Sequence, residues 1–139
     1  MVYPLRFHRY EFLPDSGGAG RYRGGLGVRR DIEFLDESGG LETQFDKFKV
    51  EPYGLDGGLP GDTGKLWLNP DSNNPRSLPS KTMNCRLRRG DIFSMMTQGG
   101  GGYGNVEDRD PEAIRRDLVA GKLTPEPARR DYGFKEAAE

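Results

Sequence analysis

The chain has 139 residues, with 21 basic and 22 acidic side chains and a formal net charge of −1. This length fits one domain and is too short for two ordinary ones, and the balanced charge argues against a nucleic-acid-binding module. Only 33% of the residues are hydrophobic, while there are 21 glycines and 10 prolines. We therefore expect an irregular, turn-rich fold that completes its core against a partner; a small monomer with long loops is the alternative.

Targeting and redox features point to a cytoplasmic, soluble chain. The first residues lack the apolar core of a signal peptide, and no apolar run approaches the ~20 residues of a membrane span. Cys85 is the single cysteine, so no disulfide forms within the chain. A reducing compartment and the absence of a membrane partner are the expectations that follow.

The first two thirds of the chain predict β-strands. Residues 5–13 are rich in aromatic and branched side chains, and their alternation slips between Phe7 and Tyr10, which predicts a β-bulge. Alternation is clear again over residues 28–34. The further predicted strands are residues 45–50 (the weakest), 65–68, 83–87 and 92–96. The last two read as a hairpin joined by a short turn at Gly90, with Met83, Cys85 and Leu87 on one apolar face.

Two short helices are predicted after the strands. Asp110 followed by Pro111 and an acidic first turn is an N-cap signal, and Gly121 is a stop signal. The same signals recur at Thr124 and Gly133. Strands first and helices last give an α+β fold, which we divide into a β-rich part (residues 1–105) and a helical tail (residues 106–139).

A glycine run at residues 99–104 is the one candidate site. Glycine lets a backbone approach a partner closely, and successive amides can bind an anion. A hinge or simple packing is the alternative. Alanine at Gly100, Gly101 or Gly102 is therefore expected to leave the isolated chain folded but to impair assembly. The predicted binding or subunit-interface residues are Gly99, Gly100, Gly101, Gly102, Tyr103 and Gly104.

Other chemistry is not predicted within this chain. Residues 61–65 resemble the end of a phosphate-binding loop, but Leu59 and Leu66 occupy positions where that loop needs glycine and a hydroxyl. His8 is the single histidine and Cys85 the single cysteine, whereas a zinc site needs several such ligands. We expect no catalytic residue, no metal ligand and no cofactor in this chain, with His8 structural and Cys85 buried.

Several stretches, in this order, resemble the C-terminal region of the hydantoinase B/oxoprolinase family, and together they span almost the whole chain. They are residues 3–6, 9–11, 15–27, 78–81, 89–91, 99–104, 110–113 and 128–133. Members of this family couple ATP use to the opening of cyclic amides or to the biotin-independent carboxylation of ketones. The resemblance implies that ATP, a divalent metal and bicarbonate are bound by other, larger A-type and B-type subunits.

The resemblance leads to three hypotheses of function. The first is a non-catalytic small subunit that completes a B-type subunit in a hetero-oligomeric ketone carboxylase of the acetophenone carboxylase kind. The second is a C-terminal fragment of an N-methylhydantoinase or oxoprolinase type of cyclic-amide hydrolase. The third is an independent β-rich binding module that uses the glycine run. A chain that starts with Met1 where the domain starts is what a separately encoded subunit would show, and so would a fragment.

Overall fold

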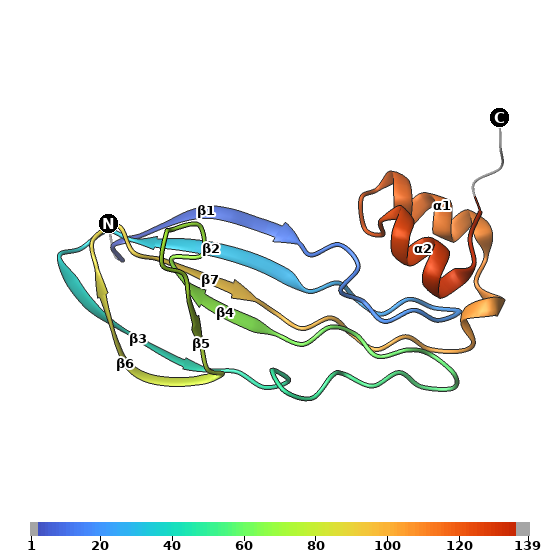
Figure 1. Cartoon of the computed structure of the whole chain (residues 1–139), viewed down its shortest axis with the longest axis horizontal. Coiled ribbons are helices and arrows are strands. Elements are labelled where there is room, and N and C mark those ends of the chain that lie inside the picture. Colours follow the sequence, from blue (N-terminus) through green and yellow to red (C-terminus); the bar gives the residue numbers. More distant parts are fainter. Residues whose placement is uncertain (1–2, 136–139) are drawn as a thin grey trace.

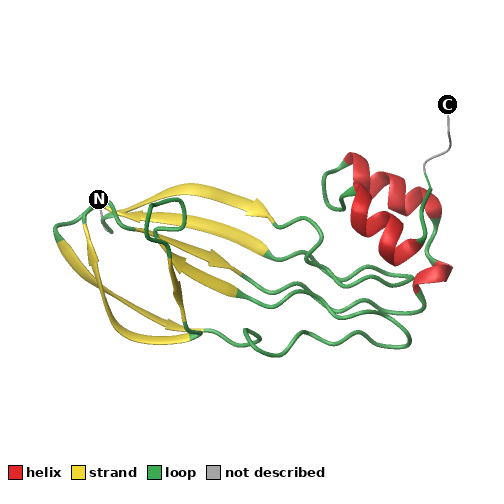
Figure 2. Cartoon of the chain, viewed as in Figure 1, coloured by secondary structure: helices red, strands yellow, loops and turns green. Residues whose placement is uncertain are grey.

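The computed structural model describes residues 3–135, which form an elongated molecule with strands at one end and helices at the other (Figure 1). Glycine-rich loops fill the middle, where they run side by side (Figure 2). This arrangement confirms the predicted α+β fold. The elements are β1 (Leu5–Phe12), β2 (Val28–Phe34), β3 (Ser38–Gln44), β4 (Lys65–Leu68), β5 (Arg76–Leu78), β6 (Lys81–Arg88), β7 (Ile92–Met96), η1 (Val106–Asp108), α1 (Pro111–Val119) and α2 (Pro125–Tyr132).

The strand end consists of two layers around an apolar core. The main sheet has the order β1-β2-β7-β4-β5 and is antiparallel throughout, while β3 and β6 pair with each other and form the second layer. Alternate residues of a strand face the same side, so one face of the main sheet supplies the core. The buried core residues are Ile32, Phe34, Leu66, Leu68, Leu78, Cys85, Leu87 and Phe93.

The predicted hairpin of residues 83–96 is wrong. The turn itself exists, because the Asp91 amide donates to the Arg88 carbonyl (3.0 Å) and Gly90 has a positive φ of 88°. However, β6 pairs with β3, whereas β7 lies between β2 and β4 in the main sheet. The turn therefore carries the chain from one layer to the other instead of joining two paired strands.

The predicted apolar face of β6 is also only partly right. Cys85 and Leu87 are buried, but Met83 is 75% exposed. Between Cys85 and Thr82 the β6 strand contains one residue more than its partner, and Asn84 has a left-handed φ of 57°. This bulge turns Met83 outward and brings Thr82 to the core side in its place.

The predicted weak strand at residues 45–50 is irregular, and the strand lies just before it, at β3. Phe45 and Phe48 stack with their ring centroids 5.5 Å apart and pack against the edge of the core. In β3, a Cβ on Gly39 would lie 2.5 Å from the ring of Phe34. Glycine therefore lets β3 cross close to this ring, although it lowers the strand propensity of the segment.

The middle of the molecule is a glycine layer, which we define as residues 13–27, 52–64 and 97–104. Backbone hydrogen bonds join these loops: the Gly18 amide donates to the Gly100 carbonyl, and the Gly100 amide donates to the Gly25 carbonyl, both at 2.8 Å. A Cβ on Gly99 would lie 1.8 Å from the Ser16 oxygen, and one on Gly102 would lie 2.0 Å from the Ala19 oxygen. Contacts that repeat every three residues are typical of extended, polyproline-II-like segments, where close backbone packing demands glycine.

The helices begin and end where the sequence signals lie. Asp110 caps α1 by accepting a hydrogen bond from the Glu112 amide (3.0 Å), and the chain leaves α2 through Gly133 in the left-handed region (φ 61°). The Thr124 hydroxyl does not cap α2 but donates to the Asp15 carboxylate (2.9 Å) in the glycine layer. Both helices of the described residues are too short and too polar to cross a lipid bilayer.

Candidate subunit interface

The glycine run lies at the centre of the glycine layer and contacts the other loops of the layer. The amides of Gly99, Gly100 and Gly102 donate to the carbonyls of Asp62 (3.1 Å), Gly25 (2.8 Å) and Leu59 (2.9 Å). These amides are already bonded within the chain, so they are not free to bind an anion in this conformation. That residues 99–104 form an interface stays a prediction. The exposed side chain of the run, Tyr103, shows which group a partner would contact.

One expectation for this run needs correction. The sequence suggests that alanine leaves the isolated chain folded, but a Cβ on Gly101 would lie 1.9 Å from the Tyr53 oxygen, and one on Gly102 would lie 2.0 Å from the Ala19 oxygen. Both atoms belong to the backbone and cannot rotate away. Gly100 is less confined, with the nearest atom at 3.1 Å. Alanine at position 101 or 102 is thus expected to destabilise the layer itself.

Tyr103 is the exposed side chain of the run, and it is 51% accessible. Tyr103 and Tyr22 exchange two backbone hydrogen bonds of 2.9 Å, and their ring centroids lie 6.3 Å apart. Leu55 forms a parallel bridge with Tyr103 from the other side. We call Tyr22, Leu55 and Tyr103 the aromatic ledge; all three are more than half exposed. Exposed aromatic side chains on a rigid backbone are frequent anchors of protein interfaces.

A second exposed apolar surface lies on β1, where all eight residues are exposed. The predicted bulge is present as a register shift between Phe7 and Arg9. Because of it, Phe7 and Tyr10 lie opposite Ile32 and Arg30, on the same face of the sheet. We call Leu5, Phe7, Tyr10 and Phe12 the β1 apolar face. A shallow pocket of about 160 Å³ lies beside Tyr10, Glu11, Phe12 and Val28.

Charged residues occupy the opposite face of β1. Glu33 accepts hydrogen bonds from His8 (2.8 Å) and Arg6 (3.2 Å). The hydrogen bond from His8 and the charge of Arg6 lower the pKa of the Glu33 carboxyl below its ordinary value. His8 is therefore held in a polar contact between β1 and β2. Among the described residues it has no metal-ligand cluster around it.

Asp31, on β2, is the most deeply buried carboxylate of the sheet, at 2% exposure. Burial raises its pKa, but hydrogen bonds from Arg29 (2.9 Å) and Ser94 (2.5 Å) outweigh this effect and leave the pKa lowered. Arg9 of β1 adds a longer ion pair at 3.4 Å. The carboxylate is thus kept ionised and ties β1, β2 and β7 together on the polar side of the sheet.

The helices are attached to the glycine layer by a buried ion cluster. Asp117 of α1 accepts from Arg23 (3.0 Å) and from Arg109 (2.5 Å), and all three side chains are at most 14% exposed. The Arg109 guanidinium also lies over the ring of Tyr132, 5.3 Å from its centroid. This cluster attaches α1 to the loop that carries Arg23, which follows Tyr22 in the sequence.

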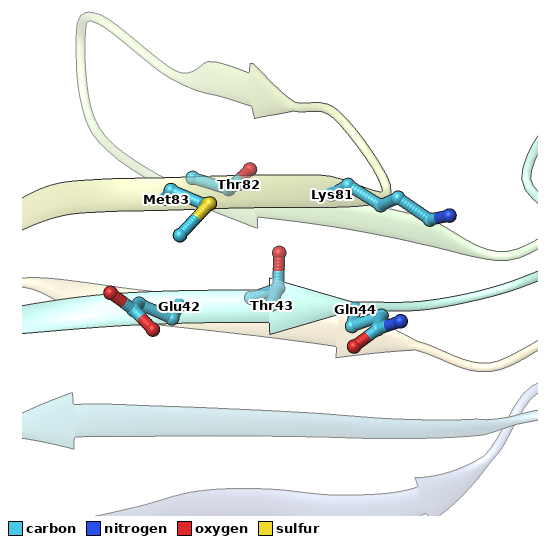
Figure 3. A pocket seen from close by; sticks show the side chains of 6 residues that line it. All are labelled: Glu42, Thr43, Gln44, Lys81, Thr82 and Met83. Carbon is cyan, nitrogen blue, oxygen red and sulfur yellow. The ribbon is translucent and has the colours of Figure 1, made fainter.

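A pocket with a volume of about 480 Å³ lies between β3 and β6. Figure 3 shows its lining from the two strands, where Thr43 and Thr82 meet at the register shift. The other lining residues are Glu42, Gln44, Lys81 and Met83. These side chains are mixed in charge, and nothing in their arrangement defines a chemical reaction. Within residues 3–135, no three His, Cys, Asp or Glu side chains gather into a metal-binding group.

The chain is thus built around a glycine layer and has two exposed apolar surfaces, the aromatic ledge and the β1 apolar face. A family model described as "Hydantoinase B/oxoprolinase" matches residues 1–106. The chain belongs to the hydantoinase B/oxoprolinase family, as the sequence motifs predicted. It is 36% identical over 132 residues to a putative D-/L-hydantoinase chain of the B type from Pseudomonas sp. (strain NS671), a match that covers 94% of this chain and 22% of the relative.

Two solved structures share the fold. The ATP-dependent caprolactamase from Pseudomonas jessenii superposes with a TM-score of 0.83 and 25% identity, covering 97% of this chain and 24% of that one. Acetone carboxylase superposes with a TM-score of 0.67 at 19% identity, covering 94% of this chain and 21% of that one, which shows a common fold. The chain thus spans about a quarter of the length of the hydantoinase and caprolactamase relatives, and 8% of the 5-oxoprolinase of Saccharomyces cerevisiae, to which it is 31% identical over 107 residues.

Proposed function

We propose that this chain completes the B-type subunit of an ATP-dependent enzyme complex as a non-catalytic component. The observation that carries the proposal is the caprolactamase superposition, in which nearly all of this chain corresponds to about a quarter of a much longer chain. The β1 apolar face and the aromatic ledge support it, because they expose the aromatic side chains that interfaces favour. ATP, a divalent metal and the substrate would be bound by the larger A-type and B-type chains.

For the reaction of the complex we propose the ATP-coupled opening of a cyclic amide. The named relatives favour it: besides the hydantoinase and the caprolactamase, the 5-oxoprolinase of Saccharomyces cerevisiae is 31% identical over 107 residues. Hydantoin, caprolactam and 5-oxoproline are all cyclic amides. Ketone carboxylation of the acetophenone type is the second candidate, and the fold shared with acetone carboxylase is what supports it.

Purification of the native protein and an activity assay test this proposal. The complex should hydrolyse ATP in a manner stimulated by one of hydantoin, 5-oxoproline or caprolactam. Stimulation by acetone or acetophenone together with bicarbonate, and by none of the amides, would select the carboxylase instead. The pure isolated chain should turn over none of these substrates, and robust turnover by it would contradict a non-catalytic role.

The glycine run is part of this proposal because it carries Tyr103. We propose that the run contributes to the subunit interface by presenting this side chain, while its glycines shape the layer beneath. Tyr22 and Leu55 flank Tyr103 on neighbouring loops, so a partner would meet the three side chains as one surface.

A further inference from the structure

Among residues 3–135, the backbone groups on the outer edge of β1 have no strand partner, and they lie beside an apolar face. We infer that this edge receives a β-strand from the larger part of a B-type subunit, so that the main sheet continues across the interface. This inference rests on the proposed function and gives the assembly a specific geometry. It concerns the β1 edge alone and is independent of which reaction the complex catalyses.

The hydrogen bonds of β2 show which groups of β1 point outward. The amide and carbonyl of Phe34 bond to Asp91 and Gly90, and those of Val28 bond to Thr97, so both residues face away from β1. Their β1 partners, Leu5 and Phe12, therefore turn their own backbone groups to the open edge, where the Leu5 amide already donates to the Tyr3 carbonyl (2.9 Å). In an antiparallel pair of strands, residues whose backbone groups point outward alternate with residues whose backbone groups bond to the partner strand.

By the same alternation, the backbone N–H and C=O groups of Phe7 and Tyr10 also point to the open edge. Phe7 lies opposite Ile32, two residues from Phe34, and Tyr10 lies opposite Arg30, two residues from Val28. Within residues 3–135, no backbone hydrogen bond from outside the β1–β2 pair reaches Phe7, Tyr10 or Phe12. An edge of this kind is a template for strand addition.

The bulge at His8 makes the same residues supply both the outward backbone groups and the apolar face. Phe7, Tyr10 and Phe12 are 61%, 69% and 64% exposed. Since an aromatic side chain contributes roughly 150–250 Å², these three present roughly 400 Å² of surface. That is about half of the ~800 Å² that one partner contributes to a standard interface. The face is thus large enough to anchor a stable contact.

The incoming strand must be amphipathic. Its apolar side chains would extend the β1 apolar face, and its polar side chains would lie beside the charged face, where Arg6 and Arg9 remain 61% and 46% exposed. Carboxylates at alternate positions of that strand would pair with these two guanidinium groups. The strand is therefore expected to alternate apolar residues with polar ones that include Asp or Glu.

The length of the relatives argues for the larger B-type part as the source of this strand. In the hydantoinase and caprolactamase relatives, more than three quarters of the chain lie outside the match. A second copy of this chain is the competing occupant, because an antiparallel β1–β1 contact could place Phe7 opposite Tyr10 and Arg6 opposite Glu11. The experiment must therefore measure self-association as well.

The test uses the purified chain and the B-type chain that accompanies it in native extract, identified by its peptides. Tyr10→Pro removes one outward amide at an edge position, where proline is tolerated. The double variant F7S/F12S removes apolar surface and keeps the backbone. Val119→Ser is the matched control, because Val119 is apolar, 90% exposed and distant from β1 on α1. Circular dichroism checks that each variant is folded, and sedimentation gives the self-association of the wild type.

The inference predicts that both β1 variants weaken binding to the B-type chain by at least about tenfold, as for interface anchors, while Val119→Ser binds like the wild type. Should Tyr10→Pro fail to fold, F7S/F12S carries the test. If the wild type binds but both variants bind equally well, strand addition at β1 is overturned while the proposed function stands. A stable wild-type dimer that is lost in the β1 variants would also overturn it. A wild type that does not bind the B-type chain would refute the proposed function itself.

Discussion

Arg23 and Asp117 are separated by 94 residues in the sequence, yet the Arg23 Nε atom lies 3.0 Å from the Asp117 Oδ2 atom. The pair joins the glycine layer to α1. Arg109, which lies between the two residues in the sequence, forms a second ion pair with Asp117. Because the three side chains are at most 14% exposed, the cluster fixes the orientation of the helices more firmly than a surface ion pair would. The helical end is thus a part of the module and not a loosely attached tail.

Replacing Asp117 should destabilise the protein. Asp117→Asn leaves two largely buried guanidinium groups without a counter-charge, which is expected to lower the free energy of unfolding by about 3 kcal/mol. Urea denaturation at pH 7 measures this change. Glu126→Gln is a suitable control, because Glu126 is an exposed residue in the first turn of α2. Equal loss of stability in both variants would contradict the role of the cluster.

The contribution of Asp117 should depend on pH. Burial acts to raise its pKa, but the hydrogen bond and charge of Arg23 and the charge of Arg109 hold the pKa below the ordinary value of 3.8. A carboxyl group whose pKa is lowered by folding adds stability above the unfolded pKa and loses it as the pH falls through the folded pKa. The stability difference between wild type and Asp117→Asn should therefore be full at pH 6 and shrink below about pH 3.8. A difference that stays constant down to pH 2 would refute this assignment.

The glycine layer gives a prediction with a matched control inside the layer. Gly101→Ala places a Cβ against the Tyr53 carbonyl and should destabilise the chain by about 3 kcal/mol, at the upper end of overpacking effects. Around a Cβ on Gly25 the structure has no heavy atom within 4 Å and no positive φ, so Gly25→Ala should change stability by less than about 1 kcal/mol. Thermal unfolding compares the melting temperatures of the two variants, and Gly101→Ala should melt at the lower temperature. Equal melting temperatures would mean that the layer is looser than described.

The N-cap of α1 gives a smaller effect. Asp110→Ala removes the acceptor of the Glu112 amide and should cost about 0.5–2 kcal/mol. Asp110→Asn keeps an acceptor at the same position and should retain most of the stability. Chemical denaturation of the two variants separates the cap from the exposed ion pair with Arg116, which lies at 3.7 Å. If both variants lose the same amount, the ion pair and not the cap is responsible.

The aromatic ledge should affect assembly and not folding. Tyr103→Ala keeps the backbone bonds to Tyr22 and removes an exposed ring, so the melting temperature should stay nearly unchanged. Binding to the B-type chain should weaken by at least about tenfold, if the ledge anchors the interface. Tyr53→Ala, which removes another exposed ring (71%) on a neighbouring loop, is the control. Unchanged binding of Tyr103→Ala would remove the glycine run from the interface.

Local signals in the sequence predicted much of the fold. The caps at Asp110 and Gly133 and the bulge after Phe7 depend on residues close together in the chain, and the structure confirms them. The partner of β6 could not be predicted in this way. A turn at Gly90 is compatible with a hairpin and with a crossing between layers, and contacts with the distant strand β3 decide between them.

The candidate site was harder to predict for the same reason. The glycines of the run at residues 99–104 are visible in the sequence, but their neighbours, such as Ser16 and Tyr53, come from distant loops. The apolar face of β1 was hidden by the slipped alternation, which the bulge resolves only when the pairing with β2 is known. The signal that could have revealed it was the density of aromatic residues in a strand with charges at most of the other positions.

We propose above that this chain is one component of a larger B-type subunit. Native mass spectrometry of the protein purified from its own cells tests it most directly. The account predicts that the 15.5 kDa chain is found in a complex with a longer hydantoinase-B-type chain, and that mild denaturation releases both. A monomer of 15.5 kDa as the single species, free of any such partner, would contradict it.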